Sequence, residues 1–295
     1  IGAFAVNLTH SYFAADGNAV APGYTPPPDP SFAVHDGPLA FLGATPVYVA
    51  LGNHDVGGGG SCGGGEEVAR ARACLNVAHA GPQWVMPGRH YAVDRGPVRF
   101  IVLDTNLVPR DYGGFGIDDE VAFVAAQSVG CDTRLCFVVG HHPPATAGDH
   151  RHDATPEYLA RMQRLLDAGG GSIRAWLVGH DHDLQHLRTP GGLDVLVSGA
   201  GSGSRWRETF GATSAGASLL FASVRWGYGV LEASAEGWTY RFEDDRAEPL
   251  FKRSLDIYSA ALGEEHNVVA GAYNNLAVLY EAQQRYDEAE PLLEH

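Results

Sequence analysis

The chain has little positive charge and almost no lysine. Its 295 residues carry 20 Lys and Arg against 35 Asp and Glu, a formal net charge of −15. A surface that neutralises a nucleic-acid backbone needs the opposite balance. Lys252 is the only lysine, so the chain contains no Gly-Lys-Ser/Thr phosphate loop. We therefore expect neither a nucleic-acid partner nor a P-loop nucleotide site.

Long hydrophobic runs are also missing. The longest candidate, Leu219 to Val230, is interrupted by Arg225 and falls short of the roughly 18 apolar residues that a membrane-spanning helix needs. The apolar content of 45% is nevertheless in the range of globular proteins. We expect a folded chain with no membrane partner.

Cysteine is scarce, and its spacing leaves two interpretations open. The four cysteines form two close pairs, Cys62 with Cys74 and Cys131 with Cys136. These pairs permit short-loop disulfides in an oxidising compartment and equally permit free thiols. The chain opens at Ile1 in a strand-like run without an initiator Met or a signal segment, so we expect its true N-terminus upstream. A secreted or periplasmic location is favoured.

The distribution of glycine divides the chain in two. Of the 38 glycines, only Gly263 and Gly271 follow residue 246. A loop-rich body therefore gives way to a glycine-poor tail. We predict one domain over residues 1–244 and a second, smaller unit over residues 245–295.

The tail contains an internal repeat with helical periodicity. Residues 247–250 read Ala-Glu-Pro-Leu and recur at 289–292, and each copy opens an apolar run. A further helix is predicted to start at Tyr286. Between the copies, an apolar stripe at helical spacing comprises Ala272, Leu276, Leu279 and Tyr280. The tail is predicted to form helical hairpins.

The body alternates short apolar runs with amphipathic segments. The runs that read as buried strands cover residues 45–51, 99–105, 134–140 and 173–179. The segments with helical spacing cover residues 66–75, 118–127 and 155–166, the last with Thr155 as its cap and Pro156 at its first position. Residues 194–242 read as strands again. This order predicts an α/β sandwich in which helices cover sheets.

Three of the strand candidates run directly into glycine and histidine. The loops read Gly-Asn-His-Asp at 52–55, Gly-His-His-Pro at 140–143 and Gly-His-Asp-His at 179–182. A single such histidine is more often an exposed or satisfied residue, but sites in α/β sheets form where loops leave the carboxyl ends of strands. Imidazole and the Asn amide oxygen are ligands for metal ions. Three loops together therefore predict a metal site.

These motifs, with residues 89–106, 195–202 and 226–242, resemble the calcineurin-like metallophosphoesterases, and within them the purple, tartrate-resistant type of acid phosphatase. The resemblance covers residues 1–244 and implies an N-terminally truncated αββα sandwich. The tail resembles the tetratricopeptide repeat of the kinesin-light-chain type, which implies a small all-α unit and a protein partner for it.

The resemblance implies a ligand set for one or two divalent or trivalent metal ions, iron together with zinc, manganese or iron. Asn53, His141 and His180 would hold one ion, and His182 would hold the other. Two such ions activate a bound water or hydroxide and clamp the phosphate oxygens.

It also implies catalytic side chains beside the metals. His54 would contact the phosphoryl group or protonate the leaving alkoxide, steered by Asp55. His150 or His152, in the loop after residues 140–143, would assist at the leaving group, although an exposed position is an equal alternative for both.

The chain departs from the family pattern near its start. His10 stands where the family has the bridging carboxylate, and an imidazole does not bridge two metals as a carboxylate does. Tyr12 is the candidate phenolate ligand, with Phe13 competing for that position. The first-strand aspartate would lie upstream of Ile1, so the chain is either a truncated fragment or a degenerate phosphoesterase.

The sequence thus predicts metal-dependent hydrolysis of phosphate monoesters by a metal-activated hydroxide, with His54 assisting. One alternative is an impaired pseudo-phosphatase that acts as an interaction module through the helical tail. The other is a phosphodiesterase or nucleotide hydrolase.

Overall fold

The computed structural model describes residues 3–5, 44–56, 66–79, 81, 83–201, 210–225, 227–243, 252, 255–256, 258–260, 263, 267–282 and 285–293. The strands are β1 Ala3–Ala5, β2 Val47–Val49, β3 Trp84–Val85, β4 Tyr91–Arg95, β5 Val98–Val102, β6 Leu135–Val139, β7 Ile173–Val178, β8 Leu184–Arg188, β9 Asp194–Ser198, β10 Ser218–Ser223, β11 Tyr228–Ser234 and β12 Gly237–Glu243. The helices are α2 Glu66–Ala78, α3 Ile117–Gln127, α4 Pro156–Gly169, α6 Asn267–Ala282 and α7 Tyr286–Leu293, with short 3-10 helices η3 Thr105–Leu107, η4 Asp149–Asp153, η5 Gly170–Ser172 and η6 Ser214–Gly216.

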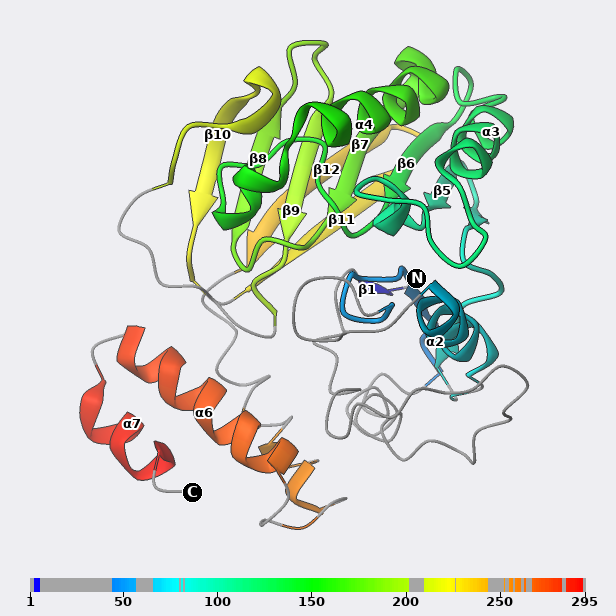
Figure 1. The fold of residues 1–295 in the computed structure, drawn as a ribbon. Coiled ribbons are helices and arrows are strands. Elements are labelled where there is room, and N and C mark those ends of the chain that lie inside the picture. The colour runs from blue at the N-terminus through cyan, green and yellow to red at the C-terminus, as the bar shows by residue number, and fades with distance from the viewer. Residues whose placement is uncertain are drawn as a thin grey trace.

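A seven-stranded mixed sheet forms the centre of the body, in the order β10-β8-β9-β7-β6-β5-β4 (Figure 1). The strands β5, β6 and β7 are parallel neighbours, with Val102 opposite Val139 and Val139 opposite Leu177. Because parallel neighbours end at the same edge of a sheet, the segments that follow these three strands start side by side.

The central strands are buried on both faces, as their continuous apolar sequences predict. From Cys136 to Val139, every residue of β6 is buried. Helices α3 and α4 cover one face of the sheet, and the hairpin β11–β12 lies behind the other (Figure 1). The side chain of Thr155 caps α4 by accepting the Tyr158 N–H at 3.2 Å, as predicted. The α/β sandwich predicted from the sequence is confirmed.

The hairpin is attached to the sheet by packing and by polar contacts to Ser198. The Trp238 ring lies edge-on to the Phe137 ring of β6, with centroids 5.4 Å apart. The backbone N–H of Gly229 donates to Ser198 Oγ of β9 at 2.9 Å. The hairpin therefore forms the second β layer over this part of the main sheet.

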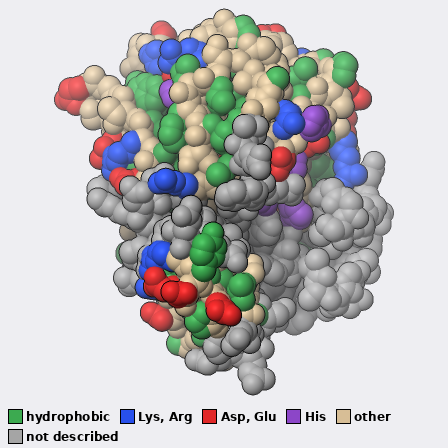
Figure 2. Space-filling view, turned by 90° about the vertical axis from the view of Figure 1, so that its left-hand side faces the viewer, with side chains coloured by type: hydrophobic (Ala, Val, Ile, Leu, Met, Phe, Trp, Pro, Cys, Tyr) green, Lys and Arg blue, Asp and Glu red, His purple; other side chains and the backbone are tan. Residues whose placement is uncertain are grey.

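Strand β10 forms one edge of the main sheet. Figure 2 views the molecule from the side on which β10 lies, and this face exposes hydrophobic side chains among charged ones. Leu219, Leu220 and Phe221 are 36%, 49% and 40% exposed. Phe221 stacks on Phe242 of β12 with centroids 5.0 Å apart. This aromatic pair joins the edge strand to the hairpin behind it.

A separate three-stranded parallel sheet, β1-β2-β3, carries the first of the predicted loops. The Tyr91 hydroxyl of β4 donates to the Val49 carbonyl at 2.8 Å and thereby links the two sheets. Helix α2 buries Ala69 and Ala73, and the Trp84 indole N–H donates to the Asn76 carbonyl at 3.1 Å. Strand β2 thus belongs to a different sheet from β6 and β7.

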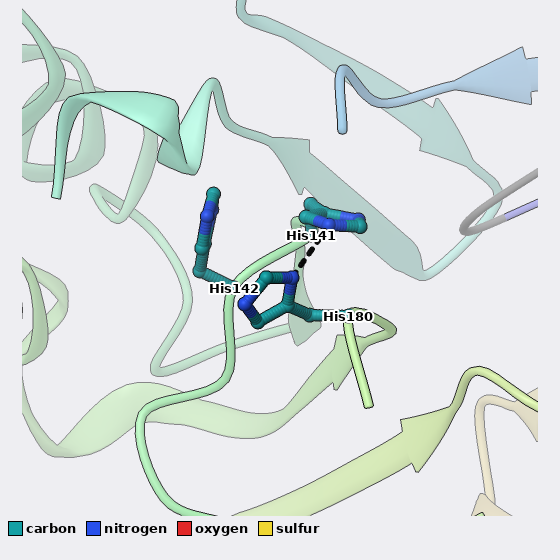
Figure 3. A group of neighbouring side chains, drawn as sticks. All are labelled: His141, His142 and His180. Atoms are coloured by element: carbon teal, nitrogen blue, oxygen red, sulfur yellow. Dashed lines mark hydrogen bonds between the residues drawn. The ribbon is translucent and has the colours of Figure 1, made fainter. Parts of the chain in front are cut away.

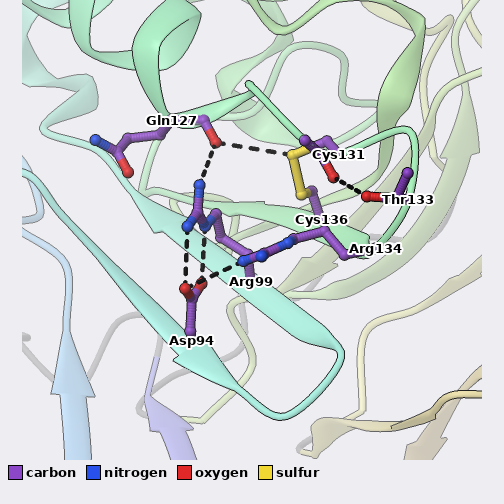
Figure 4. Close-up of a disulfide and its surroundings, with 8 residues drawn as sticks. Asp94, Arg99, Gln127, Cys131, Thr133, Arg134 and Cys136 are labelled. Atoms are coloured by element: carbon purple, nitrogen blue, oxygen red, sulfur yellow. Dashed lines mark hydrogen bonds and ion pairs between the residues drawn. A yellow bond between two sulfur atoms is a disulfide. The ribbon is translucent and has the colours of Figure 1, made fainter.

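One of the two cysteine pairs is a disulfide. Cys131 is bonded to Cys136 across a separation of five residues, which ties the loop after α3 to β6 (Figure 4). Cys74 is an exposed free cysteine on α2, and Cys62 lies outside the described residues. Near the disulfide, hydrogen bonds from Arg99, followed by Arg134, lower the pKa of Asp94 to about 2.

The tail forms a helical hairpin with a small core of its own. Helix α7 covers Tyr286–Leu293, as predicted, and packs against α6. The residues of this core are Leu276, Ala277, Tyr280 and Ala289, flanked by Leu255 and Leu292. The predicted boundary at 244/245 and the first repeat copy lie outside the described residues. Within the described part of the chain, no helix combines the length and the apolar character needed to cross a membrane.

Candidate metal centre

Three loops from three strands bring an amide oxygen and two imidazoles together. Asn53 follows β2, His141 follows β6 and His180 follows β7. The His141 Nε2 atom lies 2.8 Å from Asn53 Oδ1 and 2.9 Å from His180 Nδ1. Figure 3 shows the His141 and His180 rings meeting from their separate loops. The ligand atoms predicted for one metal ion therefore share one location.

The loop after β6 is held by a threonine in η3, the short helix that follows β5. The Thr105 hydroxyl accepts the backbone N–H of His141 at 3.0 Å and that of His142 at 2.8 Å. Gly140 is required here, because a Cβ at this position would lie 2.6 Å from the Thr105 methyl group. All four residues are buried, so the backbone before the metal-site histidine has little freedom.

The loop after β7 is fixed against the same backbone. The Gly179 N–H donates to the His141 carbonyl at 3.1 Å, and Gly140 N–H donates to the Leu177 carbonyl at the same distance. His180 adopts a φ of 69°, which is uncommon for a residue other than glycine. Such strain persists where the surroundings fix the conformation, and it is frequent at functional sites.

The loop after β2 is a tight turn closed by its own aspartate. Asp55 is fully buried, and its Oδ2 atom accepts the Gly52 N–H at 2.7 Å. In the other direction, Asp55 N–H donates to the Gly52 carbonyl at 3.1 Å. The turn presents Asn53 and His54, both half-buried. Asp55, which was predicted to steer His54, thus stabilises the turn that carries His54.

A buried polar cluster attaches this turn to the main sheet. Asn106 donates from Nδ2 to the Leu51 carbonyl at 3.3 Å and to Asp104 Oδ1 at 3.0 Å. Asp104 also accepts from Arg89 at 2.9 Å and from the Tyr112 hydroxyl. The position of Asn53 relative to the central sheet therefore depends on charged groups that follow and flank β5.

A second group of side chains shares His180. The His150 and His180 rings lie 3.8 Å apart by their centroids. Asp153 Oδ2 lies 2.8 Å from His150 Nδ1 and 3.4 Å from His180 Nε2. The His150 N–H donates to Asp181 Oδ1 at 2.9 Å. His150, predicted to act at the leaving group, therefore lies beside the predicted metal ligand.

Burial keeps the central imidazoles neutral. The pKa values of His141 and His142 are well below the usual value, and burial is the largest cause. The neighbouring histidines lower both pKa values further. Burial also lowers the pKa of His180, although its hydrogen bond to Asp153 acts in the opposite direction. The hydrogen bond from His180, followed by that from His150, lowers the pKa of Asp153 to about 2. Neutral imidazole is the form that binds metal ions.

The donor set fits a cation of intermediate softness. Two imidazole nitrogens suit zinc and iron better than calcium or magnesium. Among the described residues, His141 Nδ1 has no hydrogen-bond partner and is buried. The Nε2 atom of the same ring faces Asn53 and His180. When Nε2 binds a cation, Nδ1 can therefore carry the proton of the neutral ring.

The other predicted site residues either lie outside the group formed by Asn53, His141 and His180 or lie outside the described residues. His182 is half-buried, two residues after His180, and belongs to neither of the His/Asp groups with ligand atoms within 4.8 Å of one another. His54 is near enough to contribute to the lowered pKa of His141. His152 is exposed. His10 and Tyr12 lie outside the described residues, so a second ion site stays a prediction.

Sequence reasoning missed three residues of this centre. His142 joins His141 and His180 in a buried group of potential ligand atoms, although no role was predicted for it. Thr105 is the last residue of a predicted strand, residues 99–105, and that position at the shared sheet edge was an available signal. Asp153 lies three residues after His150, a spacing that puts both side chains on one face of a 3-10 turn.

Most of the body matches the model of a known protein family. The family model for the calcineurin-like phosphoesterases matches residues 7–184, and thus most of the body. The chain belongs to this family. Membership in the calcineurin-like phosphoesterases implies divalent metal ions, which agrees with the donor set. The tetratricopeptide repeat model matches residues 240–295. Both resemblances inferred from the sequence are therefore confirmed.

Curated relatives of this calcineurin-like phosphoesterase include acid phosphatases. Purple acid phosphatase 7 of Arabidopsis thaliana is 39% identical over 176 residues, which cover 54% of this chain and 49% of that protein. Tartrate-resistant acid phosphatase type 5 of Rattus norvegicus is 27% identical over 177 residues, covering 53% of this chain and 49% of that protein. The chain thus spans about half the length of these relatives.

A solved structure matches this calcineurin-like phosphoesterase in fold. It is GAP50, the anchor in the inner membrane complex of Plasmodium, with a TM-score of 0.50 and 21% identity. The match covers 68% of this chain and 62% of that one. At this identity the likeness concerns the fold alone.

Proposed function

We propose that the chain is a metal-dependent hydrolase of phosphate monoesters, with one cation held by Asn53, His141 and His180. The observation that carries the proposal is the meeting of their three donor atoms, 2.8 and 2.9 Å apart, from loops of two sheets. The acid phosphatase relatives support phosphoester hydrolysis as the class of chemistry.

A cation at this location would supply a Lewis acid that polarises a phosphoryl oxygen and lowers the pKa of water. The side chains of the protein would have separate tasks. His54 is half-buried next to Asn53 and close to His141. From that position its imidazole would donate a hydrogen bond to a phosphoryl oxygen or a proton to the leaving alkoxide. Asp55 would fix the turn that directs His54.

His150 would act on the side of the leaving group. Its backbone is anchored by Asp181, its ring lies against His180, and Asp153 accepts a hydrogen bond from its Nδ1 at 2.8 Å. This contact leaves Nε2 as the ring nitrogen available to a substrate. The two imidazoles of His54 and His150 thus flank the proposed cation from different loops.

Two further properties are part of the proposal. The repeat match over residues 240–295 supports a protein partner for the tail. The Cys131–Cys136 disulfide supports an oxidising compartment, such as the periplasm or the outside of the cell.

The test combines metal analysis with a turnover assay. Protein stripped with a chelator is reloaded with zinc, manganese or iron and assayed with p-nitrophenyl phosphate and with bis-p-nitrophenyl phosphate. We expect about one tightly bound ion per chain and faster turnover of the monoester. His54→Ala should lower kcat by about 100-fold or more, the usual contribution of a proton donor, while the ion content is unchanged. His141→Ala should lose the ion.

His186→Ala is the matched control. His186 is a half-buried histidine of β8 that contacts Asp194 Oδ1 at 2.9 Å, away from the proposed centre. Its substitution should change neither ion content nor turnover. Unchanged turnover in His54→Ala would contradict the assigned role, and faster turnover of the diester would contradict the substrate class.

A further inference from the structure

The ring of His180 uses both of its nitrogens, and each faces a different part of the centre. Its Nδ1 atom lies 2.9 Å from His141 Nε2, on the side of Asn53. Its Nε2 atom lies 3.4 Å from Asp153 Oδ2 on the opposite side. Figure 3 shows the Nδ1 side of the ring directed at His141. The carboxylate is thus placed behind the proposed ligand and not among the three donor atoms.

The position of Asp153 is fixed by the short helix η4. The Asp153 carbonyl accepts the Thr155 N–H at 2.7 Å, just before α4 begins. At the other end of η4, the His150 N–H donates to Asp181 Oδ1 at 2.9 Å. The same Oδ2 atom that faces His180 also accepts from His150 Nδ1 at 2.8 Å. The carboxylate therefore has a defined orientation although its side chain is 55% exposed.

This arrangement decides which nitrogen of His180 carries the proton. A neutral imidazole has one N–H and one lone pair. A carboxylate can only accept, so Nε2 carries the proton and donates to Asp153, and the lone pair remains on Nδ1. That lone pair points to the location where Asn53 and His141 meet. Metal-binding histidines commonly donate their other N–H to a carboxylate, which fixes the tautomer and makes the ligand more basic.

We propose that Asp153 is a positioning residue for the metal centre, which accepts the Nε2–H of His180 and thereby directs the Nδ1 lone pair at the cation. This inference rests on the proposed function, because it assumes a cation at Asn53, His141 and His180.

The experiment measures zinc affinity by competition with a chromophoric chelator, and the visible spectrum of the cobalt-substituted protein. Asp153→Ala should weaken zinc binding about 10- to 100-fold, the range for loss of such a carboxylate, and change the cobalt spectrum. Asp153→Asn keeps an oxygen acceptor and should recover part of the affinity. The matched control is Asp167→Ala, an exposed aspartate of α4 that accepts from Gln163 at 2.8 Å.

A fourth variant separates the two contacts of the carboxylate. His150→Ala removes the second contact of Asp153 and leaves His180 in place. Zinc affinity that falls less in this variant than in Asp153→Ala supports the proposal, because His180 then keeps its acceptor. A loss as large as in Asp153→Ala overturns it, because His150, Asp153 and His180 would then bind the ion themselves.

The remaining outcomes distinguish this inference from the proposed function. Wild-type affinity and spectrum in Asp153→Ala overturn the positioning role alone and leave the centre of Asn53, His141 and His180 intact. A wild-type protein that binds neither zinc nor cobalt overturns both. Equal weakening in Asp167→Ala overturns the positioning role, because the effect would then be one of general charge.

Discussion

The contact between Thr105 and the two histidine amides leads to a quantitative prediction for Thr105→Val. Valine has almost the shape of threonine but has no hydroxyl group. The substitution would leave the N–H groups of His141 and His142 without the acceptor that now lies at 3.0 and 2.8 Å. It would also remove the hydroxyl contact to His142 Nδ1 at 3.1 Å.

The expected cost follows from the burial of these groups. Thr105 is 0% exposed, and His141 and His142 are 4% exposed, so water cannot replace the lost acceptor. A buried polar group without a partner costs about 1 to 3 kcal/mol. Part of that cost is offset because the valine methyl is less costly to bury than a hydroxyl. We expect Thr105→Val to lower the free energy of unfolding by about 2 to 4 kcal/mol.

The assay is urea unfolding followed by far-UV circular dichroism, with Thr133→Val as the matched control. Thr133 is exposed, and its hydroxyl donates to the Gly130 carbonyl at 3.1 Å, so the control should stay within about 0.5 kcal/mol of the wild type. If the two variants unfold at the same urea concentration, the hydroxyl of Thr105 does not hold the loop, and the reasoning is refuted. Zinc affinity should fall in Thr105→Val and not in Thr133→Val.

Three other predictions concern the same body. Replacing Cys131 and Cys136 together by alanine should cost about 2 kcal/mol, because the disulfide closes a loop of only five residues; unfolding of oxidised and reduced wild type gives the comparison. Gly140→Ala should cost about 1 to 3 kcal/mol by overpacking, since its Cβ would lie 2.6 Å from the methyl of Thr105, and a thermal midpoint equal to that of the wild type would contradict this. Burial lowers the pKa of His142 well below its ordinary 6.5 in the folded chain. As the pH falls, the unfolded chain therefore binds a proton at this histidine at a higher pH than the folded chain does. The metal-free protein should therefore keep its full stability above pH 6.5 and lose, from His142 alone, up to about 1.4 kcal/mol per pH unit below it. Urea unfolding at pH 8 and pH 5 tests the sign.

Local patterns identified most of the elements that carry the site. The continuous apolar run around β6 is what a strand buried on both faces requires, and the structure has that strand at Leu135–Val139. Thr155 and Pro156 marked the start of α4 because an N-cap and a proline in the first turn satisfy or avoid orphan amides locally. Such features depend on residues close in sequence, so they can be recognised without knowledge of the fold.

One of the strands missed from the sequence depends on partners along both of its edges. Strand β8, Leu184–Arg188, pairs with β9 on one side and with β10 on the other. Its sequence includes Gln185 and His186 and has no continuous apolar run. For β2, the apolar pattern predicted the strand but not that it would join a different sheet from β6. Sheet membership is decided by pairing and packing across the chain.

The sequence by itself determined that glycine and histidine follow three buried strands, and this placed Asn53, His141 and His180 in one candidate site. Only the tertiary structure decided which atoms meet there, that Thr105 holds one loop and that Asp153 lies behind His180. The physical reason is that a strand end can be recognised from local hydrophobicity, whereas the direction of a ring nitrogen depends on acceptors contributed by segments far along the chain.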